Sequence, residues 1–210
     1  RVRCFLATKC PIQHGDAIRQ SVEASLRNLR THYLDVLQFH GGWYPAGDVR
    51  RILHGGLQAL QRLREEGVVR YIGFTAEGPS AGVSELIATG EFDVLQVRFN
   101  LMYGHTCDFV NEAGVMREAE AHGMGIVTMR TLTSGIFQKL LRHLLPEADY
   151  RLDVDAFLLN YVLSNPLVDV ALVGMRRPEE VARNAAVSDD TASRLDLAAL
   201  HHRFVKEAAR

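Results

Sequence analysis

The stretch Tyr33-Leu-Asp-Val-Leu-Gln-Phe-His40 is an apolar run of strand length that ends in a histidine and enters the loop Gly41-Gly42. Such a run between turn residues predicts a strand buried on both faces, which is typical of a parallel sheet. Its last side chain, His40, then lies at the end of that sheet. One strand and helix earlier, the run that finishes Leu6-Ala-Thr-Lys9 closes with a lysine. We therefore expect two titratable side chains at the same ends of two consecutive strands.

Buried runs alternate with amphipathic helical patterns along the whole chain. The expected strands are Val2–Lys9, Tyr33–His40, Val69–Thr75, Asp93–Asn100, Gly125–Arg130 and Asp169–Val173. The expected helices are Asp16–Arg30 with Asp16 as its N-cap, a helix capped by Asp48 that stops at Gly67, Ser80–Thr89, Asn111–His122, Ile136–Leu145, Asp153–Ser164, Pro178–Ala186 and Thr191–Glu207. Strict alternation of strand and helix predicts a parallel sheet with helices outside it.

The number of repeats decides between two α/β architectures. A closed (β/α)8 barrel typically takes about 250 residues, so six strand-helix repeats fall two short of closure. The sequence opens on Arg1 without a methionine and within an expected strand, which we interpret as a missing beginning. An open doubly wound sheet would be expected to carry a glycine fingerprint after its first strand, and this sequence has none there. We expect one domain, residues 1–210, that forms an N-terminally incomplete (β/α)8 TIM barrel.

Composition narrows the class of partner. The 210 residues are 47% hydrophobic and 23% charged with a net charge of −1, which gives neither a basic stripe for nucleic acid nor a polybasic face for a membrane. No apolar run approaches the ~18 residues of a membrane span, and no signal sequence opens the chain, so we expect a cytoplasmic protein. Cys4, Cys10 and Cys107 form neither an even framework nor a CxxC pair. We expect a small-molecule partner and no metal site.

In a barrel, the chemistry lies where the strands end. The residues at those positions are Lys9, His40, Thr75, Asn100, Arg130 and the Gly174–Arg177 loop. This largely basic set suits an anionic ligand and a carbonyl oxygen that gains negative charge during reaction. A single strand-end histidine is commonly structural, and a single strand-end lysine is commonly solvated. The coincidence of several such residues at one rim favours a site.

The last expected strand leads into a second candidate site. Gly174-Met-Arg176-Arg177-Pro178 places a flexible glycine and two arginines before a helix N-terminus, where free N–H groups and the helix dipole favour phosphate. The alternative is that the two arginines pair with Glu179 and Glu180. His201-His202 is interpreted as a solvated face, because no nearby residue in the sequence completes a metal site.

Several of these motifs together resemble the aldo-keto reductases. The matching segments are Ala7-Thr8-Lys9, Ser25-Leu-Arg-Asn-Leu29, Tyr33–His40, Leu63-Arg-Glu-Glu-Gly67, Val69-Arg-Tyr-Ile-Gly-Phe74, Gln96-Val-Arg-Phe-Asn100 and Gly174-Met-Arg-Arg-Pro-Glu-Glu-Val-Ala-Arg-Asn184. Each motif is only moderately specific, but they cover nearly the whole chain in the right order. The resemblance implies a (β/α)8 barrel that reduces aldehydes and ketones with NADPH.

The resemblance also implies residue roles. Lys9 matches the lysine that lowers the pKa of the family's catalytic tyrosine, which is sensible because a neighbouring cation stabilises a phenolate. His40 matches the histidine that orients the carbonyl. The implied cofactor-binding residues are Thr75, Gln96, Met129, Arg130, Leu132, Ser134, Gly135, Gly174, Arg176, Glu180, Arg183 and Asn184. Among these, Arg176 is the candidate for the 2′-phosphate of the cofactor.

Three departures from the family pattern matter. The family's aspartate and tyrosine lie on two βα units upstream of the lysine strand, so neither role is assigned in this sequence. The family's Ser-Asn pair is Thr75-Ala76 here, which removes one amide contact to the nicotinamide and leaves Thr75 alone. Met129 replaces the aromatic ring that often stacks on the nicotinamide.

Two functional hypotheses follow. The first is an NADPH-dependent carbonyl reductase, and the second is a noncatalytic NADP(H)-binding regulatory or interaction protein on the same fold. Trp43, Tyr44, Tyr103 and the stretch Thr131–Leu152 are expected to shape an apolar substrate pocket for an uncharged carbonyl compound. If 210 residues were the whole protein, two open sheet edges would favour a dimer or an aggregate.

Overall fold

The computed structural model describes residues 4–109, 111–147 and 153–208, with side chains described as far as Arg203. The chain divides into two compact units. The first unit is Arg1–Val97 with Glu118–Gly125, and the second is Arg98–Arg117 with Ile126–Arg210. None of the described helices is both long enough and apolar enough to cross a bilayer.

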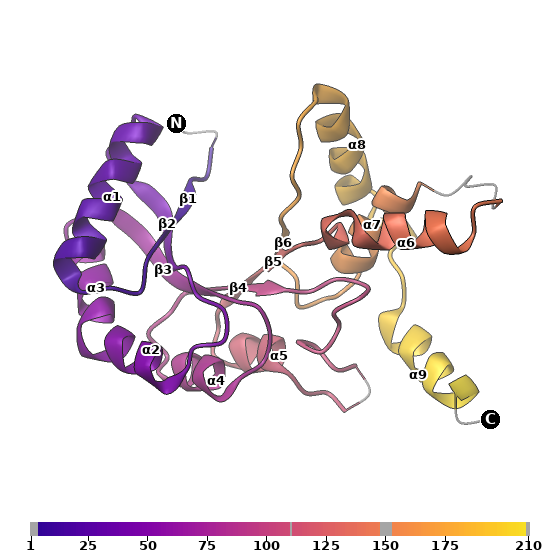
Figure 1. Cartoon of the computed structure of the whole chain (residues 1–210), viewed down its shortest axis with the longest axis horizontal. Coiled ribbons are helices and arrows are strands. Elements are labelled where there is room, and N and C mark those ends of the chain that lie inside the picture. Colours follow the sequence, from indigo (N-terminus) through magenta and orange to yellow (C-terminus); the bar gives the residue numbers. More distant parts are fainter. Residues whose placement is uncertain (1–3, 110, 148–152, 209–210) are drawn as a thin grey trace. The chain divides into compact units, whose positions relative to one another are not determined.

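The first unit is built on four parallel strands that pair in chain order. They are β1 (Ala7–Cys10), β2 (Leu34–Phe39), β3 (Val69–Ala76) and β4 (Val94–Arg98), whose last residue begins the second unit. The helices between them are α1 (Gly15–Leu29), α2 (Ala46–Arg51), α3 (Leu57–Glu65) and α4 (Ala81–Ala88). Figure 1 shows α1 and α3 side by side along the first three strands. Parallel strands buried under helices are the arrangement that the sequence pattern predicted.

Strand β2 is the centre of this unit. All six of its residues are buried, and it pairs with β1 on one side and β3 on the other. The observed strand is one residue shorter at each end than the predicted Tyr33–His40. His40 lies just beyond its end and is exposed. Strand β1 likewise begins at Ala7, and residues 2 and 3 of the predicted strand lie outside the described residues.

Burial of apolar side chains holds the first unit together. Ile18 and Val22 of α1 and Leu60 of α3 are fully or almost fully buried. Phe39 and Phe74 each meet the ring of Phe92 edge-on, with ring centroids 6.3 and 5.0 Å apart. Burying one such side chain stabilises a fold by about 1.5–3 kcal/mol, and edge-to-face ring geometry adds to this.

The predicted helix that starts at Asp48 is interrupted, so this prediction was wrong in detail. Pro45 is the N-cap of α2, with Asp48 in its first turn, and a wider π-type turn over Ile52–Gly56 separates α2 from α3. The consecutive glycines Gly55-Gly56 have little helix propensity, and the backbone departs from helical angles at His54 and Gly55. The predicted N-cap Asp16 also lies in the first turn of its helix, where His14 is the N-cap. A carboxylate in a first turn is favourable because of the helix dipole.

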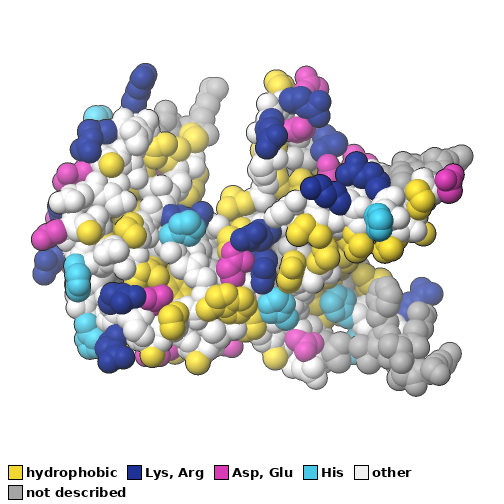
Figure 2. All heavy atoms as spheres, viewed as in Figure 1, with side chains coloured by type: hydrophobic (Ala, Val, Ile, Leu, Met, Phe, Trp, Pro, Cys, Tyr) yellow, Lys and Arg dark blue, Asp and Glu magenta, His cyan; other side chains and the backbone are white. Residues whose placement is uncertain are grey.

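The second unit contains a two-stranded parallel pair, β5 (Gly125–Met129) with β6 (Val170–Ala171), and four helices after it. The helices are α6 (Ile136–Leu144), α7 (Val154–Leu163), α8 (Pro178–Asp189) and α9 (Leu197–Ala208). Helices α7 and α8 pack together, and Figure 2 shows Lys and Arg side chains mixed with Asp and Glu around the latter. Most predicted elements of this region are present, with the shifted bounds described next.

Two helices begin later than predicted. Helix α5 (Val115–Ala121) starts four residues after Asn111, because the backbone takes positive φ at Glu112 and Gly114. A Cβ on Gly114 would come within 2.5 Å of the Thr106 carbonyl oxygen, so the chain turns there on a glycine. Position 110 of this loop lies outside the described residues. The predicted tail helix from Thr191 is instead a short 3₁₀ turn (Thr191–Ser193) followed by α9.

Candidate functional site

Lys9 and His40 lie at the carboxyl ends of adjacent strands in the first unit. Lys9 is the register partner of Gln38 on β2, and the His40 N–H donates to the Cys10 carbonyl oxygen at 2.8 Å. The His40 side chain is exposed, and Lys9 is half-buried. The structure thus brings the two predicted catalytic residues to one end of the sheet, as the strand spacing indicated.

Gln38 is a polar residue at this end that the sequence analysis missed. It is buried within β2, and its side-chain oxygen has no hydrogen-bond partner among the described residues. Its place in register with Lys9 puts an acceptor beside a cation. A buried polar atom without a partner is rare in native proteins and is typical of places that receive a ligand or water. The signal available in the sequence was a lone glutamine inside an apolar strand.

Thr75 and Gln96 are register partners on β3 and β4, and both are buried. The Thr75 hydroxyl accepts a hydrogen bond from the Gly41 N–H at 3.0 Å and donates one to the Gly41 carbonyl oxygen at 2.8 Å. A hydroxyl has one proton to donate, so the donor of Thr75 is committed to the protein backbone. The contact to a cofactor that the resemblance implied for Thr75 therefore lacks a free donor in this structure.

The predicted pocket aromatics of the first unit differ in exposure. The Trp43 side chain is 52% exposed, as a ligand-lining residue of a loop can be. Tyr44 is only 2% exposed, packs edge-on against Phe74, and donates its hydroxyl proton to the Thr75 carbonyl oxygen at 2.8 Å. Burial raises the pKa of the Tyr44 phenol above its ordinary value. The prediction that Tyr44 lines a pocket is corrected, because its ring fills the core beneath the loop.

In the second unit, the loop after β4 carries Tyr103. The Arg98 guanidinium carbon lies 4.1 Å from the centre of the Tyr103 ring, and the His105 ring meets the same ring edge-on. Burial, together with the nearby Arg98 charge, lowers the pKa of His105. Asn100 is fully buried and donates to the Arg130 carbonyl oxygen at 2.9 Å, which joins the end of β4 to the residue after β5. Tyr103 keeps its place as a predicted pocket residue.

A cavity of about 750 Å³ opens between the loops after β5 and β6. Its lining residues are Leu132, Ser134, Gly135, Gln138, Asp155, Gly174, Met175, Arg176, Glu180, Arg183 and Asn184. Eight of these eleven were predicted to bind a cofactor, whereas Met129, the last residue of β5, and Arg130, the residue after it, do not line the cavity. The sequence analysis missed Gln138, Asp155 and Met175, which the helical pattern marks only as polar or apolar positions. The volume lies in the range that small-molecule ligands need.

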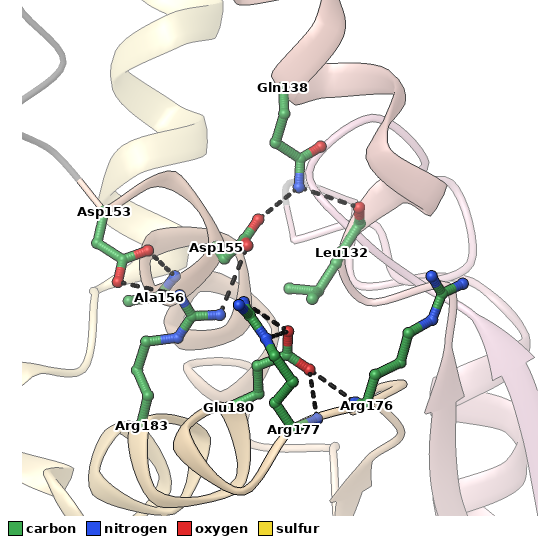
Figure 3. Close-up of polar contacts among 9 residues, drawn as sticks. All are labelled: Leu132, Gln138, Asp153, Asp155, Ala156, Arg176, Arg177, Glu180 and Arg183. Carbon is green, nitrogen blue, oxygen red and sulfur yellow. Dashed lines mark hydrogen bonds and ion pairs between the residues drawn. The ribbon is translucent and has the colours of Figure 1, made fainter.

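Glu180 organises the mouth of this cavity. Its carboxylate accepts the Arg176 N–H at 2.7 Å and the Arg177 N–H at 3.3 Å, and it pairs with the Arg177 guanidinium at 3.1 Å (Figure 3). The Arg176 N–H, followed by the contacts from Arg177, lowers the pKa of Glu180. The carboxylate therefore stays ionised and fixes the backbone that enters α8.

Arg183 is held in a second set of contacts. Its guanidinium lies 3.5 Å from Asp155 and 3.7 Å from Asp153, and Asp155 accepts a hydrogen bond from Gln138 at 2.7 Å (Figure 3). These contacts join α6, α7 and α8 around the cavity. The charge of Arg183 is thus balanced by the protein itself.

Arg176 and Asn184 differ from their neighbours. The Arg176 guanidinium makes no ion pair with any described residue, and Figure 3 shows it pointing away from the paired arginines. Asn184 is 7% exposed, and its side-chain oxygen has no partner among the described residues. An unpaired cation and a buried unpaired amide oxygen in one cavity fit a ligand that carries both an anionic group and hydrogen-bond donors. A phosphorylated adenine nucleotide is such a ligand.

The β5–α6 connection has an unusual backbone. Residues Arg130, Thr133, Ser134 and Gly135 all have positive φ, between 52° and 76°. This is the left-handed region, which costs a β-branched residue such as Thr133 the most. Strain of this kind persists where the surrounding structure holds it and clusters at ligand clamps. The connection ends at α6, where free N–H groups at a helix N-terminus favour an anion.

Metal chemistry finds no support in the part of the chain that the structure describes. No group of three or more His, Cys, Asp or Glu side chains there is placed to hold a metal ion. Cys10 follows Lys9 in β1, and burial raises the pKa of its thiol to about 12. A thiol held protonated in this way is a poor nucleophile and a poor metal ligand.

Comparison with curated proteins finds relatives named as oxidoreductases. The chain is 25% identical to L-galactose dehydrogenase of Arabidopsis thaliana over 209 residues, which cover 87% of this chain and 63% of that protein. It is 29% identical to the uncharacterized oxidoreductase YqkF of Bacillus subtilis over 84 residues, which cover 40% of this chain and 26% of that protein. The chain therefore spans less than two thirds of the length of either relative.

Solved structures show the same fold. The holo form of aldo-keto reductase AKR11C1 from Bacillus halodurans matches with a TM-score of 0.73 and 20% identity, over 94% of this chain and 70% of that one. An aldo-keto reductase from Klebsiella pneumoniae in complex with NADPH matches with a TM-score of 0.69 and 22% identity, over 90% and 66%. The alternating strands and helices thus belong to the α/β barrel fold of these enzymes, as the sequence predicted. Because the model of the aldo/keto reductase family matches residues 1–201, this chain belongs to that family.

Proposed function

We propose that this protein is an NADPH-dependent reductase of aldehydes or ketones. Family membership and the oxidoreductase relatives support an oxidoreductase. The observation that carries the finer proposal is the cavity of the second unit, in which an unpaired guanidinium and a buried unpaired amide oxygen face the same space. In an adenosine 2′-phosphate, the phosphate would pair with the guanidinium, and the exocyclic amine of adenine would donate to the amide oxygen.

Different residues of the cavity are proposed to bind different parts of the cofactor. Arg176 supplies the unpaired positive charge for the 2′-phosphate, and Asn184 offers an amide oxygen to the exocyclic amine of adenine. Leu132, Ser134 and Gly135 belong to the strained β5–α6 connection. Together with the N-terminus of α6, they are proposed to bind the pyrophosphate. Gly174, Glu180 and Arg183 complete the lining. By the resemblance, Gln96 and Met129 are proposed to contact the nicotinamide end, and Arg130 belongs to the loop over the pyrophosphate.

Bound NADPH supplies the hydride for the reduction. The residues of this chain would act on the carbonyl and on the proton balance around it. His40 is exposed at the end of β2 with its backbone fixed, so its imidazole can donate a hydrogen bond to the substrate oxygen. Lys9, on the neighbouring strand end, is a cation that stabilises a developing negative charge and would lower the pKa of an adjacent proton donor. The proton donor itself is not assigned to a residue of this chain.

The substrate is proposed to be a small uncharged carbonyl compound. Trp43 is exposed on the loop that follows His40, and Tyr103 lies on the loop after β4. Both rings offer apolar surface with a polar edge, which is typical of pockets that bind uncharged ligands. The charged groups near the strand ends are assigned to the cofactor and to the reacting oxygen.

Calorimetric titration with NADPH and NADH tests the cofactor assignment. We expect Arg176→Ala to weaken NADPH binding about ten- to hundredfold and to leave NADH binding unchanged, because only NADPH carries the 2′-phosphate. Arg177→Ala is the matched control, since its guanidinium is already paired with Glu180. Equal loss for both nucleotides, or no loss, would contradict the assignment.

Turnover separates the two hypotheses about activity. The protein is assayed with NADPH against a panel of aldehydes and ketones, with His40→Ala as the variant. A reductase loses most of its kcat in the variant while its NADPH affinity is retained. NADPH binding without turnover of any carbonyl compound would instead establish a noncatalytic NADP(H)-binding protein.

A further inference from the structure

The loop that follows β2 is tied to its neighbours at four consecutive residues. The contacts are the His40 N–H to Cys10 O at 2.8 Å, the Gly41 N–H and C=O to the Thr75 hydroxyl at 3.0 and 2.8 Å, the Gly42 C=O to the Glu77 N–H at 3.0 Å, and the Trp43 C=O to the Ser80 hydroxyl. Each of these contacts uses a backbone group of the loop. The backbone from His40 to Trp43 is therefore held along its whole length.

The contacts fix the direction in which the His40 side chain leaves the backbone. The peptide group before the Cα atom of His40 is held by Cys10, and the peptide group after it is held by Thr75. With both flanking peptide planes fixed, the Cα–Cβ bond of His40 has one direction. A Cβ on Gly41 would lie only 2.4 Å from the Tyr44 ring, so the loop can follow this path only with glycine there.

Thr75 is well suited to this task. Its side chain is 1% exposed, its hydroxyl serves both polar groups of one residue, and β-branching restricts its χ1 angle. The Tyr44 hydroxyl, which donates to the Thr75 carbonyl oxygen at 2.8 Å, ties the far end of the loop to the same residue. One residue of β3 thus holds the loop on both sides of its turn.

We propose that Thr75 is a positioning residue for His40, which acts by holding the Gly41 peptide instead of contacting the cofactor. The proposal rests on the proposed function insofar as His40 is the residue that meets the carbonyl. Thr75 itself touches neither substrate nor cofactor in this account. Its effect on the reaction passes through the orientation of the imidazole.

The decisive experiment compares Thr75→Val with Thr75→Ser in the chain as it exists. Valine keeps the shape and removes both hydrogen bonds, whereas serine keeps the hydroxyl. We expect hydrogen exchange of the Gly41 amide to rise about ten- to hundredfold in Thr75→Val and to stay near the original rate in Thr75→Ser. The ¹⁵N spectrum of the His40 imidazole should change in the valine variant and recover in the serine variant.

A matched control separates loop loosening from general loss of stability. Thr128→Val removes the hydroxyl of another buried threonine, which has a single long contact of 3.5 Å to the Val170 carbonyl oxygen in the second unit. It should leave the Gly41 exchange rate and the His40 spectrum unchanged. Trp43, the only tryptophan in the sequence, gives a second readout, since its fluorescence anisotropy should fall in Thr75→Val alone.

Two outcomes overturn the proposal. One is unchanged loop exchange in Thr75→Val, and the other is a loss of NADPH affinity in that variant with the loop unaffected, which would make Thr75 a cofactor contact. If Thr75→Val does not fold, the unsubstituted chain still decides, because a rapidly exchanging Gly41 amide contradicts the tether. These readouts need neither turnover nor bound NADPH, so a failure of the proposed function remains distinguishable.

Discussion

The beginnings of the strands and the loops after their ends are built in opposite ways. At the beginnings, three aspartates make one repeated contact: Asp35, Asp93 and Asp169 accept the N–H groups of Leu6, Ile72 and Ile126 at 2.8, 2.8 and 2.7 Å. Each carboxylate stands at the start of β2, β4 or β6 and satisfies a backbone donor in the preceding strand or, for Leu6, just before it. Arg70 and Arg64 pair with Asp35 and Asp93, so the charges of these two aspartates are also balanced.

At the opposite ends, some polar side chains lack a partner and one connection has a strained backbone, although the backbone of the loop after β2 is held by hydrogen bonds. Gln38 and Asn184 have side-chain oxygens without a partner among the described residues, and Thr133 carries a positive φ. In α/β barrels the strand beginnings serve stability, and the loops after the strand ends serve chemistry. In this chain the three aspartates at the strand beginnings and the unpaired oxygens of Gln38 and Asn184 follow the same division.

The largest expected effect on stability comes from removing an aspartate at a strand beginning, where the carboxylates satisfy backbone donors. Asp35 is 3% exposed and holds both the Leu6 N–H and Arg70. We expect Asp35→Ala to lower the free energy of unfolding by about 2–3 kcal/mol, because hydrogen bonds to a charged group are lost and a donor is left without its partner. Urea denaturation followed by circular dichroism measures this change.

Asp93→Ala provides the comparison for that measurement. Asp93 makes the same contact to Ile72, but its side chain is 37% exposed, so water can replace part of what is lost. Its cost should therefore be smaller than that of Asp35→Ala. A loss in Asp35→Ala no larger than in Asp93→Ala would contradict the role assigned to burial.

In the cavity of the second unit, removal of a polar atom that lacks a hydrogen-bond partner should weaken cofactor binding without lowering the free energy of unfolding. We expect Asn184→Leu to weaken NADPH binding about tenfold, while the free energy of unfolding stays the same or rises, because no protein hydrogen bond to the Asn184 oxygen is lost. Calorimetry and urea denaturation on the same sample measure the two quantities. Loss of stability with unchanged affinity would place Asn184 among the structural residues.

The sequence predicted this division only where the signal was local. The strand order, the placement of Lys9 and His40 at neighbouring strand ends and the residues around the start of α8 depend on periodicity and on turn residues close in the chain. Eight of the eleven residues that line the cavity were named as well, but as a set they were implied by the resemblance and not by periodicity. Periodicity reports which side chains are buried, and strand ends follow from it.

What the sequence could not predict depends on contacts between distant residues. Tyr44 was expected in a pocket, but Gly41 and Gly82 leave the space that its ring and backbone fill, and Thr75 holds its hydroxyl 31 residues away. The hydroxyl of Thr75, which the resemblance assigns to the cofactor, hydrogen-bonds to both polar backbone groups of Gly41, 34 residues away. A loop's direction is decided by such partners, and no pattern within the loop identifies them.

A smaller effect concerns the pH dependence of the cavity mouth. The folded protein lowers the pKa of Glu180 below its ordinary 4.5, so its contacts stabilise the fold above about pH 4.5 and are lost as the pH falls through the lowered value. We expect the melting temperature of Glu180→Gln to lie below that of the original chain at neutral pH, and the difference to vanish in acid. Glu179→Gln is the control, and an equal pH dependence of both variants would contradict the assignment.

The smallest effect is expected at Gln38, and it tests the comparison most directly. Its side-chain oxygen already lacks a partner among the described residues, so Gln38→Leu removes a buried polar atom without breaking a hydrogen bond to that atom. The free energy of unfolding should stay unchanged or rise by up to ~1 kcal/mol. Gln96→Leu is the matched control, since Gln96 is another buried glutamine of a parallel strand and does have a partner, so its loss should destabilise the fold. If both variants lost the same stability in urea denaturation, the Gln38 oxygen would have a structural partner, and the strand end beside Lys9 would be as closed as the strand beginnings.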